Sequence, residues 1–171
     1  MSQFKKYDRS GTRGYAQLAE IDAPAARVWQ VLTDVALVRI WYGADAEIDA
    51  RKGGRYRVGR IGAGGREAHI DIFDVNRRLR LIYMDGSGTP PCTSAIVDDF
   101  LLDIRKGAGK TSLRLLGSGI PEAQAWDPLY KNIRLGWERH MARIKAALEI
   151  PMRPAAARVK PPEPPLPGID Y

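Results

Sequence analysis

The feature that most constrains this fold is an apolar stripe on a predicted helix near the C-terminus. The stretch 126–149, WDPLYKNIRLGWERHMARIKAALE, is rich in helix-forming residues. At roughly 100° per residue, its large apolar side chains fall within a stripe about 80° wide. The stripe consists of Trp126, Tyr130, Ile133, Trp137, Met141, Ile144 and Leu148. Such a helix must lie on an apolar surface, and only a sheet formed by the preceding residues is large enough.

Gly136 interrupts this helix directly before Trp137. A glycine inside a helix costs about 1 kcal/mol relative to alanine. Gly136 falls at the edge of the stripe, beside Leu129, His140 and Ala147. We therefore expect that the missing side chain lets the helix approach another element closely, or that it leaves empty space beside Trp137.

The residues before this helix predict an α+β fold. A strand is expected at 14–21, followed by two short helices, DAPAARVWQVLTD and VALVRIWYG, the second capped by Asp34 and closed by Gly43. From Ala46 the apolar period switches to two. Strands are expected near 45–49, 54–61, 66–75, 78–84, 95–105 and 110–117, joined by the turn segments RKGG, GAGG, VNR, DGSGTPPCTS and KGAGK. Such short connections indicate an antiparallel meander.

The composition predicts one folded domain with two extensions. A chain of 171 residues with 44% hydrophobic residues can bury a core without disulfides. We assign residues 14–150 to this domain and residues 1–13 to a flexible N-terminal segment. Residues 151–171 contain seven prolines and predict an extended or disordered Pro-rich tail. The tail could dock in an aromatic groove of a partner, although we favour a passive role.

Composition also limits the compartment and the partners. A single cysteine, Cys92, excludes an internal disulfide, and no apolar run is long enough for export or membrane insertion, so a cytoplasmic protein is expected. The net charge of +7 arises partly from two basic clusters: Arg51, Lys52, Arg55, Arg57, Arg60 and Arg66, and then Arg77, Arg78 and Arg80. We interpret the first as a solvated strand face and keep an anion-binding face as the alternative. No recognition helix or aromatic platform accompanies them, so nucleic-acid binding is not expected.

Several short motifs fail their structural requirements. GAGKT at 107–111 has Ile104 where a phosphate loop needs glycine, and a strand follows it, so it predicts a hairpin turn. The two histidines and one cysteine have no metal-ligand spacing and no GxSxG partner. We therefore expect no metal, no cofactor and no nucleophile triad.

The order of elements resembles the helix-grip fold of the SRPBCC/START superfamily, which is also seen in the major birch pollen allergen. The phrases APAARVWQVLTD, IWYG, KGGRYRV, VNRRLRLIY and LGWERHMARIKAALE resemble its AHSA-type branch, named after activators of a heat-shock chaperone ATPase. The resemblance implies a bent sheet of about seven strands around the long C-terminal helix. It also implies an apolar cavity between them for a lipid-like, polyketide-like or aromatic molecule, with Trp41-Tyr42 and Gly136-Trp137 in the core. The sequence departs from many relatives at DVNRRL, where they carry DPPRRL.

Alternation along the strands places candidate residues in this cavity. In AIVDDFLLDI, the set Ile96, Asp98, Phe100, Leu102 and Ile104 is predicted to face inward, with Val97 outward. A carboxylate among hydrophobic residues would be a site candidate. The competing interpretation, which we favour, is a bulge that turns Asp98 and Asp99 to solvent.

The histidines give weaker candidates. In REAHIDIFDV, the set Ala68, Ile70 and Ile72 is predicted inward, which places His69 and Asp71 together on the opposite face. They could pair there as a functional pair, but a solvent-facing pair is favoured. His140 borders the helix stripe, where packing at the cavity rim is favoured over catalysis. The weak catalytic candidates are therefore Asp98 and His140.

Aromatic residues dominate the predicted cavity wall, where they can grip an apolar ligand. The predicted ligand-binding set is Trp41, Tyr56, Tyr83, Asp98, Phe100, Trp126, Tyr130, Ile133, Gly136, Trp137, His140 and Met141.

The function we favour is non-catalytic carriage or sensing of a small hydrophobic or aromatic ligand, because apolar walls are evident and a catalytic constellation is not. One alternative is a cyclase, dehydratase or hydrolase that uses Asp98, His140 or a cavity tyrosine. Another is a chaperone-regulating or other protein-partner module acting through the tail or the basic face. A homodimer is left open.

Overall fold

The computed structural model describes residues 11–60, 64–84, 92, 94–104 and 109–150. Within them the order of elements is β1 (Thr12–Ile21), α1 (Ala25–Thr33), α2 (Val35–Tyr42), β2 (Ala46–Ile48), β3 (Arg55–Val58), β4 (Arg66–Asp74), β5 (Arg78–Tyr83), β6 (Val97–Asp103), β7 (Thr111–Pro121), a 3-10 turn (Gln124–Trp126) and α3 (Asp127–Glu149). Residues 1–10 of the predicted N-terminal segment 1–13, the predicted tail 151–171, and all or part of the turns GAGG, DGSGTPPCTS and KGAGK lie outside the described residues. Thr12 and Arg13, predicted to belong to the flexible segment, are part of β1.

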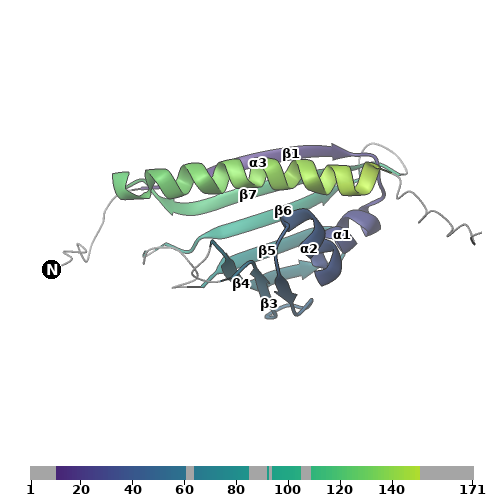
Figure 1. Ribbon diagram of the computed structural model, residues 1–171, viewed down its shortest axis with the longest axis horizontal. Helices are drawn as coiled ribbons and strands as arrows, with labels where there is room; N and C mark the ends of the chain where they lie inside the picture. Colours follow the sequence, from purple (N-terminus) through teal and green to yellow (C-terminus); the bar gives the residue numbers. More distant parts are fainter. Residues whose placement is uncertain (1–10, 61–63, 85–91, 93, 105–108, 151–171) are drawn as a thin grey trace, which may run out of the picture.

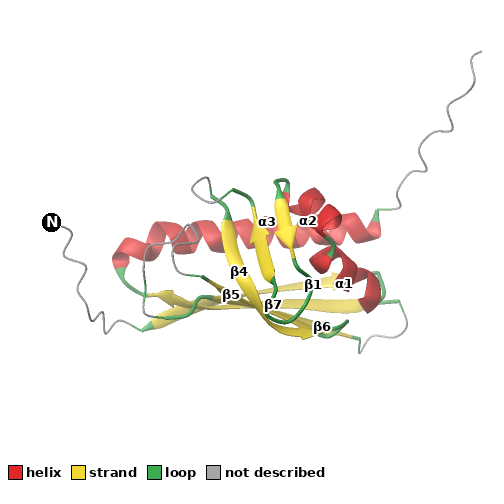
Figure 2. Cartoon of the chain, turned by 90° about the horizontal axis from the view of Figure 1, so that it is seen from below, coloured by secondary structure: helices red, strands yellow, loops and turns green. Residues whose placement is uncertain are grey.

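The seven strands of the described residues form one antiparallel sheet in the order β1-β7-β6-β5-β4-β3-β2. Helix α3 runs along one face of this sheet, while α1 and α2 lie together near one end (Figure 1). Figure 2 shows that the sheet bends strongly, so that β4 turns up toward α3. The predicted helix-grip architecture is confirmed.

The apolar stripe of α3 faces the sheet as predicted. Ile133, Trp137, Met141, Ile144 and Leu148 are buried, and Trp126 is buried in the 3-10 turn just before the helix. The inner face of the sheet supplies matching apolar residues, among them Leu81, Phe100 and Leu113, each fully buried. Burial of these faces provides the main favourable free energy of folding. No helix of the described residues is long and apolar enough to cross a membrane.

The two short helices begin and end as the sequence predicts, apart from Pro24. Asp34 caps α2, since its Oδ1 accepts hydrogen bonds from the backbone N–H groups of Ala36 (2.9 Å) and Leu37 (3.3 Å). Gly43 ends α2 with a φ of 77°, which favours glycine. Pro24 occupies the N-cap of α1 instead of its first turn.

A register shift in β4 corrects the faces predicted for that strand. The register of β4 against β5 shifts between Ile70 and Ile72, so Phe73 takes the inward place predicted for Ile72 and packs edge-on against Trp29 at 5.0 Å. A bulge therefore reverses the alternation in the middle of β4.

Strand β6 ends at Asp103, and Ile104, predicted to face inward, is exposed. Val97, predicted to face outward, is buried at the other end of that strand. Strand β7 continues to Pro121, beyond the predicted end at Gly117.

Candidate functional site

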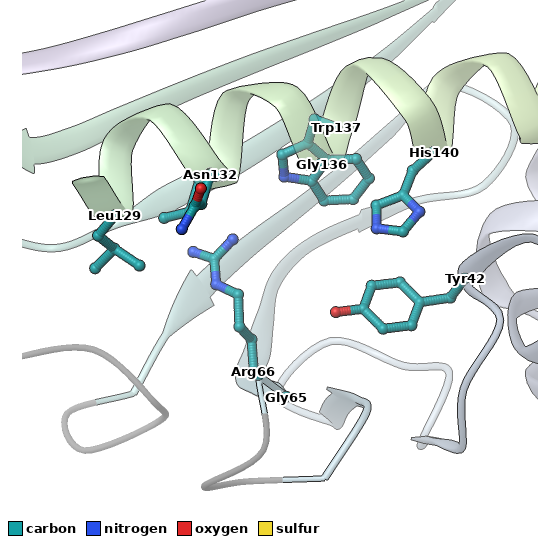
Figure 3. Close-up of a pocket in the computed structure, with 10 residues that line it drawn as sticks. Tyr42, Gly65, Arg66, Leu129, Asn132, Gly136, Trp137 and His140 are labelled. Carbon is teal, nitrogen blue, oxygen red and sulfur yellow. The ribbon is translucent and has the colours of Figure 1, made fainter. Parts of the chain in front are cut away.

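A pocket of about 250 Å³ lies between α3 and the start of β4. Helix α3 contributes Leu129, Asn132, Ile133, Gly136, Trp137 and His140; the rest of the lining comes from Tyr42, Gly64, Gly65 and Arg66. Figure 3 shows Arg66 rising from β4 toward α3, with the hydroxyl of Tyr42 directed toward the same space. The side chains of the described residues therefore leave a partly open space between α3 and the start of β4.

Of the two roles predicted for Gly136, the structure supports empty space beside Trp137. Apart from its two chain neighbours and the local helix backbone, a Cβ added at Gly136 would meet no heavy atom within 4 Å. The glycine does not permit close contact with another element; it leaves space beside Trp137.

One end of the pocket has an aromatic wall. The ring of His140 stacks on Tyr42 with centroids 4.5 Å apart and an interplanar angle of 21°. Trp41 and Trp137 meet the His140 ring edge-on at 5.5 and 5.6 Å. Phe100 supports Trp137 from the sheet at 5.3 Å. Such walls favour flat apolar groups.

Arg66 is the most informative residue of the pocket. Its basic cluster predicted a position on the solvent-exposed strand face, and this prediction is wrong. Its side chain is only 13% exposed. The guanidinium lies over the Tyr83 ring, 3.6 Å from its centroid, and Nη1 is 3.6 Å from Oδ2 of Asp98. Ala68 was predicted to face inward, and every second residue of a strand shares a face. Arg66, two residues before Ala68, could therefore have been predicted to face inward as well.

Asp98 faces inward and is fully buried. The favoured bulge at the Asp98-Asp99 pair is wrong, because β6 keeps a continuous register with both neighbours. The Tyr15 hydroxyl donates to Oδ1 of Asp98, and the Tyr83 hydroxyl donates to Oδ2 at 2.5 Å. Asp98 thus lies beneath the pocket, where it holds Tyr15, Tyr83 and Arg66 together. Asp99, by contrast, accepts two hydrogen bonds from Arg78.

Burial and neighbouring charges shift several pKa values in this region. Burial raises the pKa of Tyr15 and of Tyr83, and Asp98 raises both further. Burial opposes the charge of Arg66, but Tyr83, Asp98 and Tyr15 outweigh it and raise the pKa of the guanidinium. Arg66 therefore stays positively charged in the interior.

The charge state of His140 differs from that of Arg66. Burial and the nearby Arg143 lower the pKa of His140 to about 4, and the Trp41 backbone offsets this only in part. Nδ1 of His140 is buried, and no described residue forms a well-formed hydrogen bond with it. At neutral pH this imidazole is uncharged.

Two donors of Arg66 are also unpaired. Nε and Nη2 are both buried and have no hydrogen-bond partner among the described residues. Since buried polar groups are nearly always paired, this vacant edge is the strongest chemical signal of the site.

The other predicted ligand-binding residues surround the pocket without lining it. Trp41, Tyr56, Phe100, Trp126 and Met141 are buried in the core. The hydroxyl of Tyr56 donates to the Leu32 carbonyl at 2.7 Å, and that of Tyr130 donates to the Gly14 carbonyl at 2.8 Å. Ile133, Gly136, Trp137 and His140 are the predicted residues that do line it. Tyr42 and Asn132 were missed, as was Tyr15 beneath the pocket.

The remaining basic residues mostly pair with acids on the surface. Arg55 contacts Glu47 and Glu67, and Arg57 contacts Asp45 and Glu47. In the second cluster, Arg80 lies 3.8 Å from Asp71, so Asp71 pairs with arginine while His69 is exposed. Within the described part of the chain, no group of three or more His, Cys, Asp or Glu side chains could hold a metal ion.

Comparison with known proteins gives a family match. Residues 22–149 match the family described as "Activator of Hsp90 ATPase homolog 1-like protein". Among proteins with curated descriptions, no match was found.

Solved structures share the fold. Protein MLL2253 from Mesorhizobium loti is 19% identical with a TM-score of 0.67, over 80% of this chain and 96% of that one. The Aha1 dimer from Colwellia psychrerythraea is 17% identical with a TM-score of 0.66, over 81% and 97%. PFC0360w, an HSP90 activator from Plasmodium falciparum, is 13% identical with a TM-score of 0.66, over 78% and 94%. At these identities the likeness concerns the fold alone.

Proposed function

The chain belongs to the Activator of Hsp90 ATPase homolog 1-like family, and from that premise we propose that it binds a small aromatic or hydrophobic ligand as a non-catalytic carrier or sensor. The observation that carries the proposal is the pocket of about 250 Å³ beside Trp137, opened by the missing side chain of Gly136. Pockets for drug-sized ligands occupy about 300–1,000 Å³, so a ligand of one or two rings suits this volume.

The chemistry around the pocket favours binding over catalysis. Asp98 lies outside the lining, and its two oxygens already accept hydrogen bonds from Tyr15 and Tyr83. A general base works best with a pKa near the operating pH, whereas the pKa of His140 is lowered to about 4. Neither candidate is therefore arranged to exchange protons with a ligand near pH 7.

The test is binding of a neutral aromatic probe, 2-acetylnaphthalene, followed by titration calorimetry and by tryptophan fluorescence. We expect saturable binding by the natural chain and loss of binding in Gly136→Leu, because the new side chain occupies the space beside Trp137. Ala142→Leu adds the same side chain at an exposed position of α3 and is the matched control. Equal binding by both variants would refute the pocket as the ligand site.

A second candidate is a protein-partner module, which the family description and the printed name of the Plasmodium relative favour. An Hsp90-type chaperone is then the expected partner, met through the basic face or the tail. Stimulation of chaperone ATPase activity by the purified chain tests this candidate, and an unchanged ATPase rate would argue against it. The printed name of the Colwellia relative makes a dimer a further proposal, which sedimentation can decide. The single cysteine supports a cytoplasmic location for either role.

A further inference from the structure

Resting on the proposed function, we propose that the ligand is an aromatic carboxylate whose two oxygens bind the Nε and Nη2 donors of Arg66. An arginine side chain is mostly withdrawn from solvent, yet one edge of its guanidinium, Nε and Nη2, contacts no acceptor of the described residues. Leaving buried donors unpaired costs more than an ordinary hydrogen bond contributes.

The same protein shows what this edge of a guanidinium binds. On the opposite face of the sheet, Nε and Nη2 of Arg78 donate to the two oxygens of Asp99 at 3.0 and 2.7 Å. This parallel pair of hydrogen bonds is the preferred arrangement of arginine and carboxylate. Arg66 presents the same two donors, but it directs them toward the pocket, as Figure 3 shows for its guanidinium.

The internal partner of Arg66 does not use this edge. Asp98 approaches Nη1 at 3.6 Å, and its oxygens also accept hydrogen bonds from Tyr15 and Tyr83. These contacts hold the guanidinium in place from below and leave its other edge, Nε and Nη2, without an acceptor in the described part of the chain. Arg66 is therefore positioned before a ligand arrives, which lowers the entropic cost of binding.

The charges around the pocket favour an anion. Arg66 is the only charged side chain among the lining residues that the structure describes. Arg143 and Arg139 lie close enough to His140 to act on it electrostatically, and they add positive potential at the far end. Asp98 is fully buried, pairs with Arg66 at 3.6 Å and does not line the pocket. A carboxylate thus meets a cationic side chain and no acidic group among the described lining residues.

The position of the aromatic wall indicates which chemical group is attached to the carboxylate of the ligand. Tyr42, Trp137 and His140 lie beyond the guanidinium along α3, and at neutral pH His140 is uncharged. A flat ring directly attached to the carboxylate can then contact these rings while the oxygens reach Arg66. The pocket volume limits this ring system to about the size of naphthalene.

The experiment compares 2-naphthoate with 2-acetylnaphthalene, a neutral ketone of the same shape, by titration calorimetry at pH 7.5. We expect 2-naphthoate to bind at least about tenfold more tightly, since a hydrogen bond to a charged group contributes more than one to a neutral group. The preference should persist at 0.5 M NaCl, because a buried contact is screened much less than a surface one. Equal affinities would overturn the inference and leave the proposed function standing, whereas binding of neither probe would overturn both.

Two variants assign the preference to Arg66. Asp98→Asn keeps Arg66 and removes its internal counter-charge, so the preference for 2-naphthoate over 2-acetylnaphthalene should persist in this variant even where both affinities fall. Adding Arg66→Met to Asp98→Asn should remove the preference, at least about tenfold, and leave 2-acetylnaphthalene unaffected. A preference that survives this double variant would place the carboxylate elsewhere, on the basic surface, and would overturn the inference.

The natural chain provides a measurement that does not depend on folding of the variants. In an NMR titration, the Nε–H signal of Arg66 should shift downfield on addition of 2-naphthoate and remain nearly constant with the ketone. The Nε–H signal of Arg78, already bonded to Asp99, is the internal control. Movement of neither signal at saturating 2-naphthoate would refute the contact.

Discussion

The ring of Tyr15 lies directly over Gly117 on the neighbouring strand, and a Cβ at Gly117 would overlap its carbon atoms. Gly117 is also the cross-strand neighbour of Asp98, to which the Tyr15 hydroxyl donates. The absence of a side chain at Gly117 therefore lets Tyr15 reach the buried carboxylate. The hydrogen bond from Tyr15 to Asp98 beneath the pocket therefore depends on a glycine at position 117 of β7.

This contact predicts a large effect of Gly117→Ala. The added methyl must displace the Tyr15 ring, which overpacks the core and breaks the hydrogen bond to Asp98, so we expect a loss of about 2–4 kcal/mol in the free energy of unfolding. Urea denaturation followed by circular dichroism measures it. The double variant Gly117→Ala/Tyr15→Ala should lose less than the sum of the two single variants. Additive losses would show that the ring does not transmit the effect.

Gly136→Ala is predicted to have the opposite sign. Apart from its two chain neighbours and the local helix backbone, a Cβ at Gly136 meets no heavy atom within 4 Å. The change therefore removes conformational freedom of the unfolded chain without a clash with another element. We expect stabilisation by about 0.5–1 kcal/mol. Chemical denaturation beside Gly117→Ala supplies the comparison. Destabilisation by Gly136→Ala would mean that the space beside Trp137 is filled.

The buried pair of Arg66 and Asp98 should behave as a unit. Removing either charge leaves the other uncompensated in the interior, so Arg66→Met and Asp98→Asn should each cost about 3–5 kcal/mol. The double variant should cost less than their sum by about 1–3 kcal/mol. A double-mutant cycle in urea measures this coupling.

Arg78→Met is the matched control for this cycle. Arg78 forms a geometrically better pair with Asp99, but its side chain is 40% exposed, so its loss should cost at most about 1 kcal/mol. If Arg78→Met proves as costly as Arg66→Met, burial does not set the strength of these pairs.

The sequence predicts most of the architecture because the relevant signals are local. The stripe from Trp126 to Leu148 needs only the helical period, and Asp34 and Gly43 mark the ends of α2 through their own backbone preferences. Each of these features depends on residues within a few turns of one another.

The pocket was less predictable because it depends on pairing between distant residues. Alternation predicts that Asp98 faces inward. The free-energy cost of burying its carboxylate is offset only by its partners Tyr15, Tyr83 and Arg66. Arg66 belongs to a run of basic residues that otherwise face solvent, so its own inward position was not evident. The bulge after Ile70 shows that alternation itself fails where a strand bends. Predicting the site therefore requires the partners of a charge as well as its face.

His140 predicts a pH dependence of stability. Its pKa is about 4 in the folded protein and about 6.5 in an unfolded chain, so the unfolded state binds the proton more readily. The stabilising contribution of the neutral ring is fully present above pH 6.5 and is lost as the pH falls from 6.5 through 4. Because His140 is partly exposed, solvent screening reduces the expected loss to about 1–2 kcal/mol.

The charged and titratable neighbours of His140 support this direction. Arg143 and Arg139 on α3 oppose its protonation. The stacked Tyr42 on α2 carries no charge at acidic pH, because the ordinary pKa of tyrosine is about 10 and burial raises the pKa of Tyr42 further. His140→Phe keeps a flat ring and does not titrate. Urea denaturation of both proteins at pH 7.5 and pH 4.5 should therefore show a smaller loss for His140→Phe. Parallel losses would mean that the acid sensitivity comes from the carboxylates alone.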